Sequence, residues 1–176
     1  LPITLPVSLQ QSPDVALGNY TGRDLKENYE EDILVGYRWY DTKKIEPLYP
    51  FGFGLSYTSF AISNGATDKK TFDVNDTVTL KCTIKNTGQL EGAEVLQLYA
   101  SQPVCSVLRP QKELKAFEKV VLKAGEQKEV SLKVKVKDLA FYDEKNANWK
   151  VEPGEFIFHL GTSSKEIVNS VSVQVK

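Results

Sequence analysis

Two segments of this chain alternate apolar and polar residues so regularly that only an extended strand accounts for them. The first runs from Thr77 to Lys85 and the second from Glu129 to Lys137. Successive side chains of a strand point to opposite faces of a sheet, whereas a helix repeats about every 3.6 residues. Each segment is therefore predicted to be a half-buried β-strand. The apolar positions are Val78, Leu80, Cys82 and Ile84 in the first segment, and Val130, Leu132, Val134 and Val136 in the second.

Further apolar stripes extend this pattern toward the end of the chain. They fall in 156–160 and 171–175, and two more strands are expected over Glu94 to Ala100 and Glu113 to Leu122. The latter two are partly apolar on both faces, so each either lies centrally or has one face covered by another domain. Turn residues such as those of Ala124-Gly125-Glu126 separate the strands at short intervals. Seven or eight short strands joined in this way predict an all-β, antiparallel, immunoglobulin-like sandwich.

The first 55 or so residues lack this pattern. Three prolines among the first 13 residues interrupt any long helix, 14–31 is polar and loop-like, and only Ile33 to Tyr40 is predicted to be a strand. A segment with one strand buries too little surface to fold alone, so it must dock on the sandwich or on a missing domain. A stiff, turning connection rich in proline and glycine follows, from Pro47 to Gly54. We place the domain boundary there, with 1–56 before it and 57–176 after it.

The charge balance argues against polyanionic partners. Lys plus Arg number 22 and Asp plus Glu number 23, which gives a formal net charge of −1. Neither a nucleic acid nor a membrane is therefore predicted as a partner. No apolar run reaches the roughly 18 residues that a membrane-spanning helix needs. The chain contains no Met and opens at Leu1, which indicates a fragment or a processed product.

Cysteine and histidine are too few to predict a metal site. The only histidine is His159, and no Cys/His spacing suggests zinc, so neither a metal nor another cofactor is predicted. Cys82 lies on the apolar side of a predicted strand and Cys105 lies in a predicted loop, so free thiols are favoured over a disulfide. Asn19-Tyr20-Thr21 and Asn75-Asp76-Thr77 match N-glycosylation acceptors, which matter only in a eukaryotic secretory protein.

Several short blocks of residues run through the whole chain in a characteristic order. Near the start they are Tyr29 with Glu31, Val35-Gly36-Tyr37-Arg38-Trp39-Tyr40-Asp41, and Tyr49-Pro50-Phe51-Gly52-Phe53-Gly54-Leu55-Ser56-Tyr57. Downstream they are Lys85-Asn86-Thr87-Gly88, Gly92-Ala93-Glu94-Val95, Gln97-Leu98-Tyr99, Arg109-Pro110, Lys112-Glu113-Leu114, Phe117-Glu118-Lys119-Val120, Leu139-Ala140-Phe141-Tyr142-Asp143 and Pro153-Gly154-Glu155-Phe156. Together these blocks resemble the C-terminal end of the family 3 glycoside hydrolases, the β-glucosidase and β-xylosidase group.

The resemblance implies a division of labour within a longer parent protein. In that family a TIM-like barrel supplies the nucleophilic Asp, a following α/β sandwich domain usually supplies the acid/base Glu, and a fibronectin type III-like domain often closes the chain. Residues 1–56 would then be the tail of the α/β sandwich domain, and 57–176 the fibronectin type III-like domain. The implied partners are the catalytic barrel and α/β domains of the parent and its carbohydrate substrate, in a secreted or periplasmic location.

No residue of this chain inherits a catalytic role from the resemblance. Retaining glycoside hydrolysis needs two carboxyl groups about 5 Å apart. Glu30 and Glu31 are adjacent, and neighbours on an extended chain point to opposite faces. The isolated chain is therefore expected to be inactive and to form the structural portion of an exo-acting β-glycosidase. The alternative is a carbohydrate-binding or protein-docking β-sandwich module.

The aromatic run around Tyr37 and Trp39 is the main candidate for contact with a sugar. Aromatic rings can stack on the C–H face of a pyranose, but both residues would share a strand face with Ile33 and Val35, which favours core packing. Arg38, on the opposite face, is expected to pair with a carboxylate of the parent rather than with substrate. Tyr37, Arg38 and Trp39 are thus the candidate sugar-proximal or interdomain residues.

Two residues of the sandwich carry weaker signals. Trp149 follows a polar turn and is expected to anchor an edge of the sandwich, with an exposed sugar platform as the alternative. His159 alternates away from Phe158 and Leu160, which indicates a surface or interdomain position.

Overall fold

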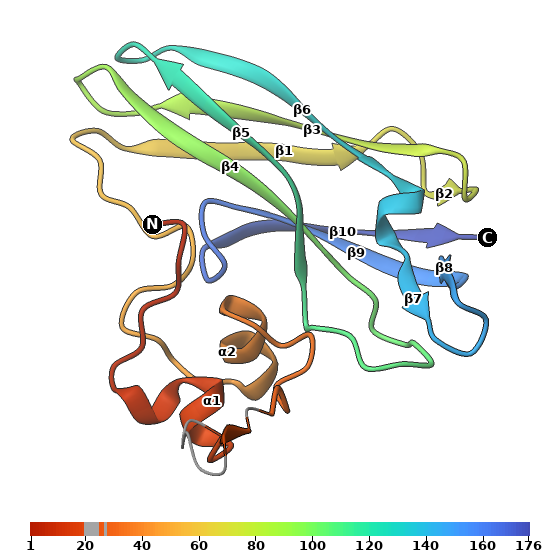
Figure 1. Ribbon diagram of the computed structural model, residues 1–176. Coiled ribbons are helices and arrows are strands. Elements are labelled where there is room, and N and C mark those ends of the chain that lie inside the picture. Colours follow the sequence, from red (N-terminus) through yellow and green to blue (C-terminus); the bar gives the residue numbers. More distant parts are fainter. Residues whose placement is uncertain (20–24, 27) are drawn as a thin grey trace.

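Most of the chain forms an antiparallel β-sandwich, as the alternating segments predict. The computed structural model describes residues 1–19, 25–26 and 28–176, so the triplet Asn19-Tyr20-Thr21 lies partly outside the described residues. Figure 1 shows two layers of strands, with the helices of the amino-terminal segment gathered beside one of them. Every strand pair is antiparallel except the short parallel pairing of β2 with β10.

The two layers are a three-stranded and a five-stranded sheet. The first has the order β1-β3-β6, with β1 at Phe60–Thr67, β3 at Thr77–Asn86 and β6 at Gln127–Lys135. The second has the order β2-β10-β9-β4-β5, with β2 at Thr71–Phe72, β10 at Ile167–Val175, β9 at Gly154–Gly161, β4 at Gly92–Ser101 and β5 at Glu113–Leu122. The described residues form ten strands, more than the seven or eight expected, because β2 and a separate two-stranded hairpin are short additions.

The core lies between the two sheets and contains the alternating residues that the sequence singles out. Every second residue of β3 from Val78 to Ile84 is buried, and β6 repeats this from Val130 to Val134. Removing such side chains from water stabilises the fold by about 25 cal/mol per Å² of apolar surface. The facing sheet contributes Leu96 and Leu98 from β4, Phe156, Phe158 and Leu160 from β9, and Val171, Val173 and Val175 from β10.

The second alternating segment leaves the strand conformation earlier than predicted. β6 ends at Lys135, and a 3₁₀ helix, η3 (Val136–Leu139), follows in place of the last predicted strand residues. Val136 is nevertheless fully buried, and its amide donates a hydrogen bond to the carbonyl of Asp76 at 3.0 Å. Because its side chain enters the core in either conformation, alternation could not locate the end of the strand. The η3 helix leads into the hairpin of β7 (Phe141–Asp143) and β8 (Asn148–Lys150).

The amino-terminal segment is helical where it is regular. It contains a 3₁₀ turn, η1 (Leu9–Gln11), and two short helices, α1 (Pro13–Ala16) and α2 (Tyr37–Lys43). The prediction of a strand over Ile33 to Tyr40 is therefore wrong.

Gly36 separates the two halves of the mispredicted strand. It precedes α2 with φ 57° and ψ −135°, a conformation through which an extended run cannot continue. Trp39 is buried in the helix, whereas Ile33 and Val35, which were predicted to share its face, are exposed. Aromatic and β-branched residues favour strands only where they fit a pleated, half-buried surface. Here the tertiary packing of α2 overrides that preference.

The segment docks on the sandwich, one of the two alternatives that the sequence left open. It lies against the outer face of the five-stranded sheet (Figure 1), so that Gln97 and Tyr99 of β4 are buried on the side away from the core. Leu5 forms an isolated antiparallel bridge with Tyr49, which ties the start of the chain to the connection before β1. β4 lies centrally and is covered on both faces, whereas β5 is an edge strand. Within the described part of the chain, no helix is both long and apolar enough to cross a membrane.

Candidate functional site

Tyr37 joins α2 to the sandwich through both its hydroxyl and its ring. The hydroxyl accepts a hydrogen bond from the amide of Leu114 in β5 at 2.7 Å. The ring meets that of Tyr99 edge-on, with centroids 5.7 Å apart, and lies beside Phe51 at 5.1 Å. Burial raises the pKa of the Tyr99 hydroxyl far above its usual value, and the neighbouring Tyr37 and Asp41 contribute smaller increases. Tyr99 therefore stays protonated and donates its hydrogen to Gln97.

Trp39 belongs to the interior of the amino-terminal segment itself. It is buried together with Leu34 and Tyr40, and its indole nitrogen donates to the carbonyl of Gln11 at 3.1 Å. The ammonium group of Lys43 lies 5.3 Å from the ring centroid. A ring held on all these sides is not free to stack on a sugar, so the expectation of core packing describes Trp39 well, although the face that it shares is helical.

Arg38 reaches a carboxylate, Glu113, at the start of β5. Its guanidinium lies 3.4 Å from one carboxylate oxygen, while Arg109 and Lys115 approach the other oxygen at 3.0 and 3.5 Å. Burial raises the pKa of the Glu113 carboxyl, but Lys115, Arg109 and Arg38 together lower it by more, so the net pKa lies below its ordinary value. Glu113 is thus an ionised acceptor for three cations. It is not poised to act as a nucleophile or as a general acid.

A second ion pair joins α2 to the same strand edge. The ammonium nitrogen of Lys112 lies 2.7 Å from Oδ2 of Asp41, and the two side chains are 11% and 3% exposed. Lys165 approaches the other oxygen of Asp41 at 3.8 Å. Nearby, Thr42 accepts a hydrogen bond from the amide of Gln111 at 3.0 Å. Residues of α2 thus contact four consecutive positions, from 111 to 114, immediately before and within β5.

The connection between the amino-terminal segment and the sandwich packs closely against the five-stranded sheet at Gly52. A Cβ at this position would lie 2.4 Å from the side-chain nitrogen of Gln97 and 2.9 Å from the Cα of Ser163. The glycine also has φ 86°, a conformation that residues with a side chain rarely adopt. Next to it, the amide of Ser164 donates to the carbonyl of Phe51 at 2.8 Å. The close approach of the two backbones explains why glycine stands here.

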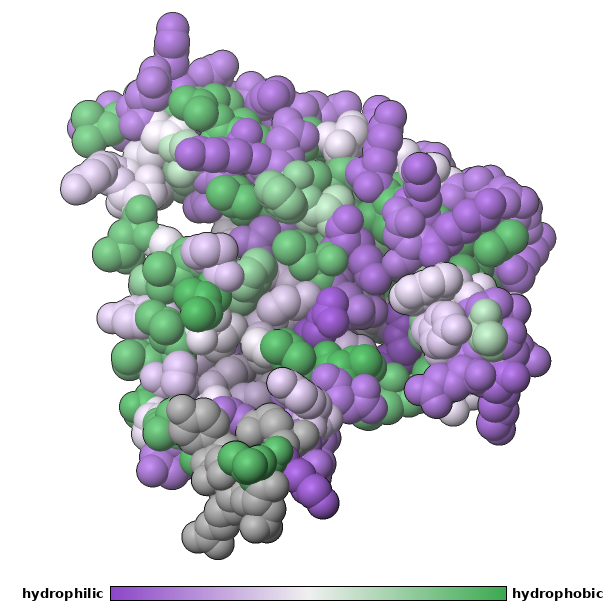
Figure 2. Space-filling view, in the orientation of Figure 1, coloured by the Kyte–Doolittle hydropathy of each residue, from purple (hydrophilic) through white to green (hydrophobic). Residues whose placement is uncertain are grey.

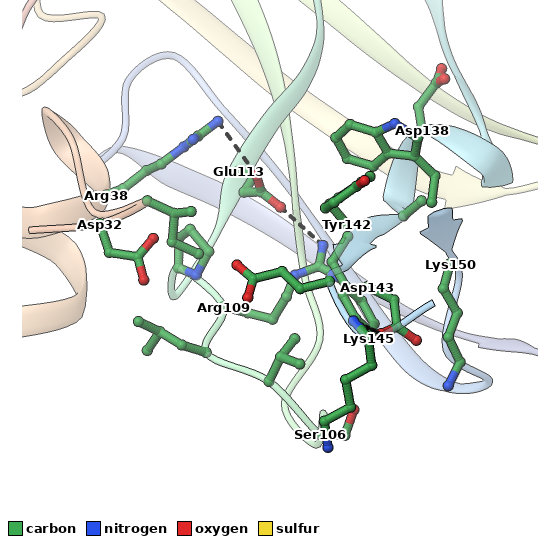
Figure 3. Close-up of a pocket in the computed structure, with 18 of the residues that line it drawn as sticks. Asp32, Arg38, Ser106, Arg109, Glu113, Asp138, Tyr142, Asp143, Lys145 and Lys150 are labelled. Atoms are coloured by element: carbon green, nitrogen blue, oxygen red, sulfur yellow. Dashed lines mark hydrogen bonds and ion pairs between the residues drawn. The ribbon is translucent and has the colours of Figure 1, made fainter. Parts of the chain in front are cut away.

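A pocket of about 890 Å³ opens beside the Glu113 cluster. Figure 3 shows Arg38, Arg109 and Glu113 on one side of it and Tyr142, Asp143 and Lys150 of the β7–β8 hairpin on the other. Five acidic and five basic side chains line it, so it carries no net charge. The described residues hold no group of three or more His, Cys, Asp or Glu that is arranged to bind a metal ion.

Trp149 is 72% exposed and rests against Tyr142 at the hairpin. The expectation that it anchors an edge of the sandwich is therefore wrong. His159 is half-buried, and its two ring nitrogens lie 2.9 Å from the hydroxyls of Ser101 and Ser170. Cys82 is buried and Cys105 partly buried, and both thiols are free. Burial, with a smaller contribution from nearby glutamates, raises the pKa of Cys82 to about 11.

The sequence pattern predicts no role for the partners of α2 on the sandwich. Asp41, Arg109, Lys112 and Glu113 all stand within the family-like blocks, but no local pattern indicates that they meet. The available signal was the charge of Lys112 and Glu113 at the edge of a strand predicted to be partly covered. Charged side chains are rarely buried unless they are paired.

Comparisons with known proteins show which class of domain the sandwich resembles. A family model described as a fibronectin type III-like domain matches residues 94–164. The β-glucosidase BoGH3A of Bacteroides ovatus is 44% identical over 99% of this chain and 24% of its own length. The thermostable β-glucosidase B of Acetivibrio thermocellus is 45% identical over 98% of this chain and 22% of its own length.

A solved structure shows the same correspondence in three dimensions. The structure of the family 3 β-glucosidase of Bifidobacterium adolescentis superposes on this chain with a TM-score of 0.91 and 37% identity. The superposition covers 98% of this chain and 25% of the β-glucosidase chain. The chain thus aligns with the C-terminal part of family 3 glycoside hydrolases of the β-glucosidase type, and its residues 94–164 match a fibronectin type III-like domain. It spans about a quarter of the length of the relatives that it matches.

Proposed function

We propose that this chain is the structural, non-catalytic portion of an exo-acting β-glycosidase of the β-glucosidase type. Its partners are the catalytic barrel and α/β domains of the parent protein, and the carbohydrate substrate is that of the parent. The sandwich holds the end of the α/β domain in place and thereby steadies the catalytic part. A secreted or periplasmic location is part of the proposal, and nucleic acids and membranes are not among the partners.

The docking of α2 on β5 is the observation that carries this proposal. The charged groups at the junction are engaged in attachment. Asp41 forms a buried pair with Lys112, and Glu113 pairs with three cations. The lowered pKa of Glu113, caused by its three cations despite burial, keeps this carboxyl ionised and makes it a poor catalytic acid. In this proposal Tyr37, Arg38 and Trp39 are interdomain residues that hold the junction and do not contact sugar.

The exposed apolar residues of the amino-terminal segment support a missing partner. Leu1, Ile3, Val7 and Leu9 are 47%, 55%, 63% and 60% exposed. Figure 2 shows hydrophobic residues gathered on the side of the molecule that this segment forms. Large exposed apolar patches are typical of interaction surfaces. We assign this surface to contact with the rest of the parent's α/β domain.

The proposal is tested on the natural gene product. Its intact mass and its hydrolysis of an aryl β-glucoside are measured, and the same measurements are made on a variant that lacks residues 57–176. We expect a longer, active protein whose truncated form is lost to aggregation or inactivates faster on heating. An inert product that begins near Leu1, or a truncated form as active and as stable as the whole, would overturn the proposal.

A further inference from the structure

We propose that the pocket beneath the β7–β8 hairpin binds a neutral oligosaccharide, with one sugar ring stacked on Trp149. This would be an accessory binding site, additional to the structural role proposed above. Its occupant would contact the aromatic pair of the hairpin together with Asp138, Lys145 and Lys150 of the pocket lining. The pocket is an open depression, and its volume of about 890 Å³ falls in the range of about 300–1,000 Å³ typical of small-molecule sites.

The aromatic pair is exposed, and its two rings pack against each other. Trp149 is 72% exposed and Tyr142 is 50% exposed, and their rings meet edge to face with centroids 5.6 Å apart at an interplanar angle of 71°. Leaving two such large apolar surfaces in water forgoes the stabilisation that burial would bring. A rigid ring with a free face is suited to the C–H side of a pyranose.

The turn of the hairpin holds this pair in place. The carboxylate of Asp143 accepts hydrogen bonds from the side-chain nitrogen of Asn146 at 2.8 Å and from the amide of Lys145 at 3.1 Å. Asp143 and Asn148 close the two-stranded ladder, in which Tyr142 is the direct partner of Trp149. The platform is therefore organised before any ligand arrives, which lowers the entropic cost of binding.

The charges of the pocket favour a neutral ligand. Its five acidic and five basic side chains balance, so the pocket has no net attraction for an anion or a cation. Glu113 is already engaged by three cations. Asp138, Lys145 and Lys150 make no ion pair with any residue that the structure describes. They offer acceptors and donors to hydroxyl groups, and a sugar presents many hydroxyls around one apolar face.

The two tryptophans give a direct test, because one is buried and the other exposed. Trp39 is 5% exposed, so ligand-induced changes in the fluorescence of the 176-residue chain report on Trp149. Titration with cellotetraose should shift the emission to shorter wavelength, and calorimetry should give the same affinity. Trp149→Ala should abolish the shift and weaken the affinity at least about tenfold, the loss expected for a stacking aromatic.

Phe117→Ala is the matched control. Phe117 is another exposed aromatic residue, 67% exposed on β5, and it does not line the pocket. Its removal should leave cellotetraose binding unchanged. Circular dichroism of both variants checks that the sandwich remains folded.

Four outcomes would overturn the inference. The first is the absence of cellotetraose binding by the folded chain, and the second is equal weakening in the Trp149→Ala and Phe117→Ala variants. The third is binding of oligogalacturonate, an acidic saccharide, in place of cellotetraose. The fourth is binding by the chain but not by the full gene product, which would show that the parent covers the pocket. None of these measurements involves hydrolysis, so they leave the proposed structural role untouched.

Discussion

The ammonium nitrogen of Lys112 lies 2.7 Å from Oδ2 of Asp41, and this buried ion pair links two segments 71 positions apart in the chain. Asp41 belongs to α2 of the amino-terminal segment, and Lys112 immediately precedes β5 of the sandwich. Two charges taken out of water stabilise a fold only while each has its partner. The pair therefore makes the docking of the segment specific to one position on the sheet.

Loss of one partner should be costly. Asp41→Ala leaves the Lys112 ammonium without its main partner in a buried site and should lower the free energy of unfolding by about 3–5 kcal/mol. Replacing both by apolar residues, as in Asp41→Leu with Lys112→Met, should cost less than either single change. Urea denaturation followed by tryptophan fluorescence measures the difference.

Glu129→Ala provides the control for this pair. It breaks the exposed pair of Glu129 and Lys81, whose charged groups lie 3.5 Å apart, and should cost less than about 1 kcal/mol. Similar losses for Asp41→Ala and Glu129→Ala would show that the buried pair does not hold the junction.

The Glu113 cluster should give the protein a measurable sensitivity to acid. The folded-state pKa of Glu113 lies below its ordinary value of 4.5, because its three cations outweigh the effect of burial. Its contribution to stability is therefore complete above that value and is lost as the pH falls through the folded pKa. Glu113→Gln should lower the free energy of unfolding by about 1.5–3 kcal/mol at neutral pH.

The pH profile distinguishes the charge of Glu113 from its shape. Unfolding free energies of the natural chain and of Glu113→Gln are measured from neutral to strongly acidic pH. The difference between them should stay constant down to about the ordinary carboxyl pKa and shrink below it. A difference that does not change with pH would mean that the carboxylate is not held by its cations.

The sandwich was predictable from the sequence because one face of each strand is buried and the other is not. Buried and more exposed residues alternate in β3 from Val78 to Ile84, and the sequence shows this as alternating apolar and polar residues. No comparable pattern indicates the helix α2. Its aromatic residues fit a strand by propensity, and only the positive φ of Gly36 together with the packing of Trp39 decides for a helix.

The junction could not be predicted, because its contacts join residues that are distant in the chain. Arg38 was expected to meet a carboxylate of the parent, and it does pair with a carboxylate, but nothing in the sequence identified that group as Glu113. Likewise, the exposure of Trp149 depends on a hairpin that stands apart from the two sheets. Periodicity reports whether a face is buried, not what covers it.

His159 should titrate below its ordinary pKa. Burial lowers its pKa from 6.5, and the nearby positive charge of Lys112 lowers it further. The folded protein then binds fewer protons than the unfolded chain as the pH drops below that value, so stability falls until the folded pKa is reached. His159→Gln, which retains hydrogen-bonding capacity toward Ser101 and Ser170, should remove this part of the pH dependence.

The single histidine makes this measurement simple. An NMR titration of the one imidazole in the chain should give a midpoint below 6.5. A midpoint at or above 6.5 would contradict the half-buried setting between the two serines.

Gly52 and Gly54 should respond very differently to the same substitution. A Cβ on Gly52 meets Gln97 at 2.4 Å and the backbone of Ser163 at 2.9 Å, and the residue has φ 86°, whereas a Cβ on Gly54 meets nothing within 4 Å. Gly52→Ala should therefore destabilise the chain by at least about 1–3 kcal/mol. Gly54→Ala should change stability by no more than about 0.5 kcal/mol. Thermal unfolding compares the two variants, and equal shifts in Tm would mean that the connection is not pinned at Gly52.

If this chain has the structural role proposed for it in the parent protein, the pure 176-residue chain should not hydrolyse an aryl β-glucoside. We expect no release of the aryl group above the buffer blank, under conditions in which the full gene product turns over. Turnover by the pure chain that persists through repurification, and that is lost when a carboxylate such as Asp138 or Asp143 is changed to its amide, would rule out a purely structural role.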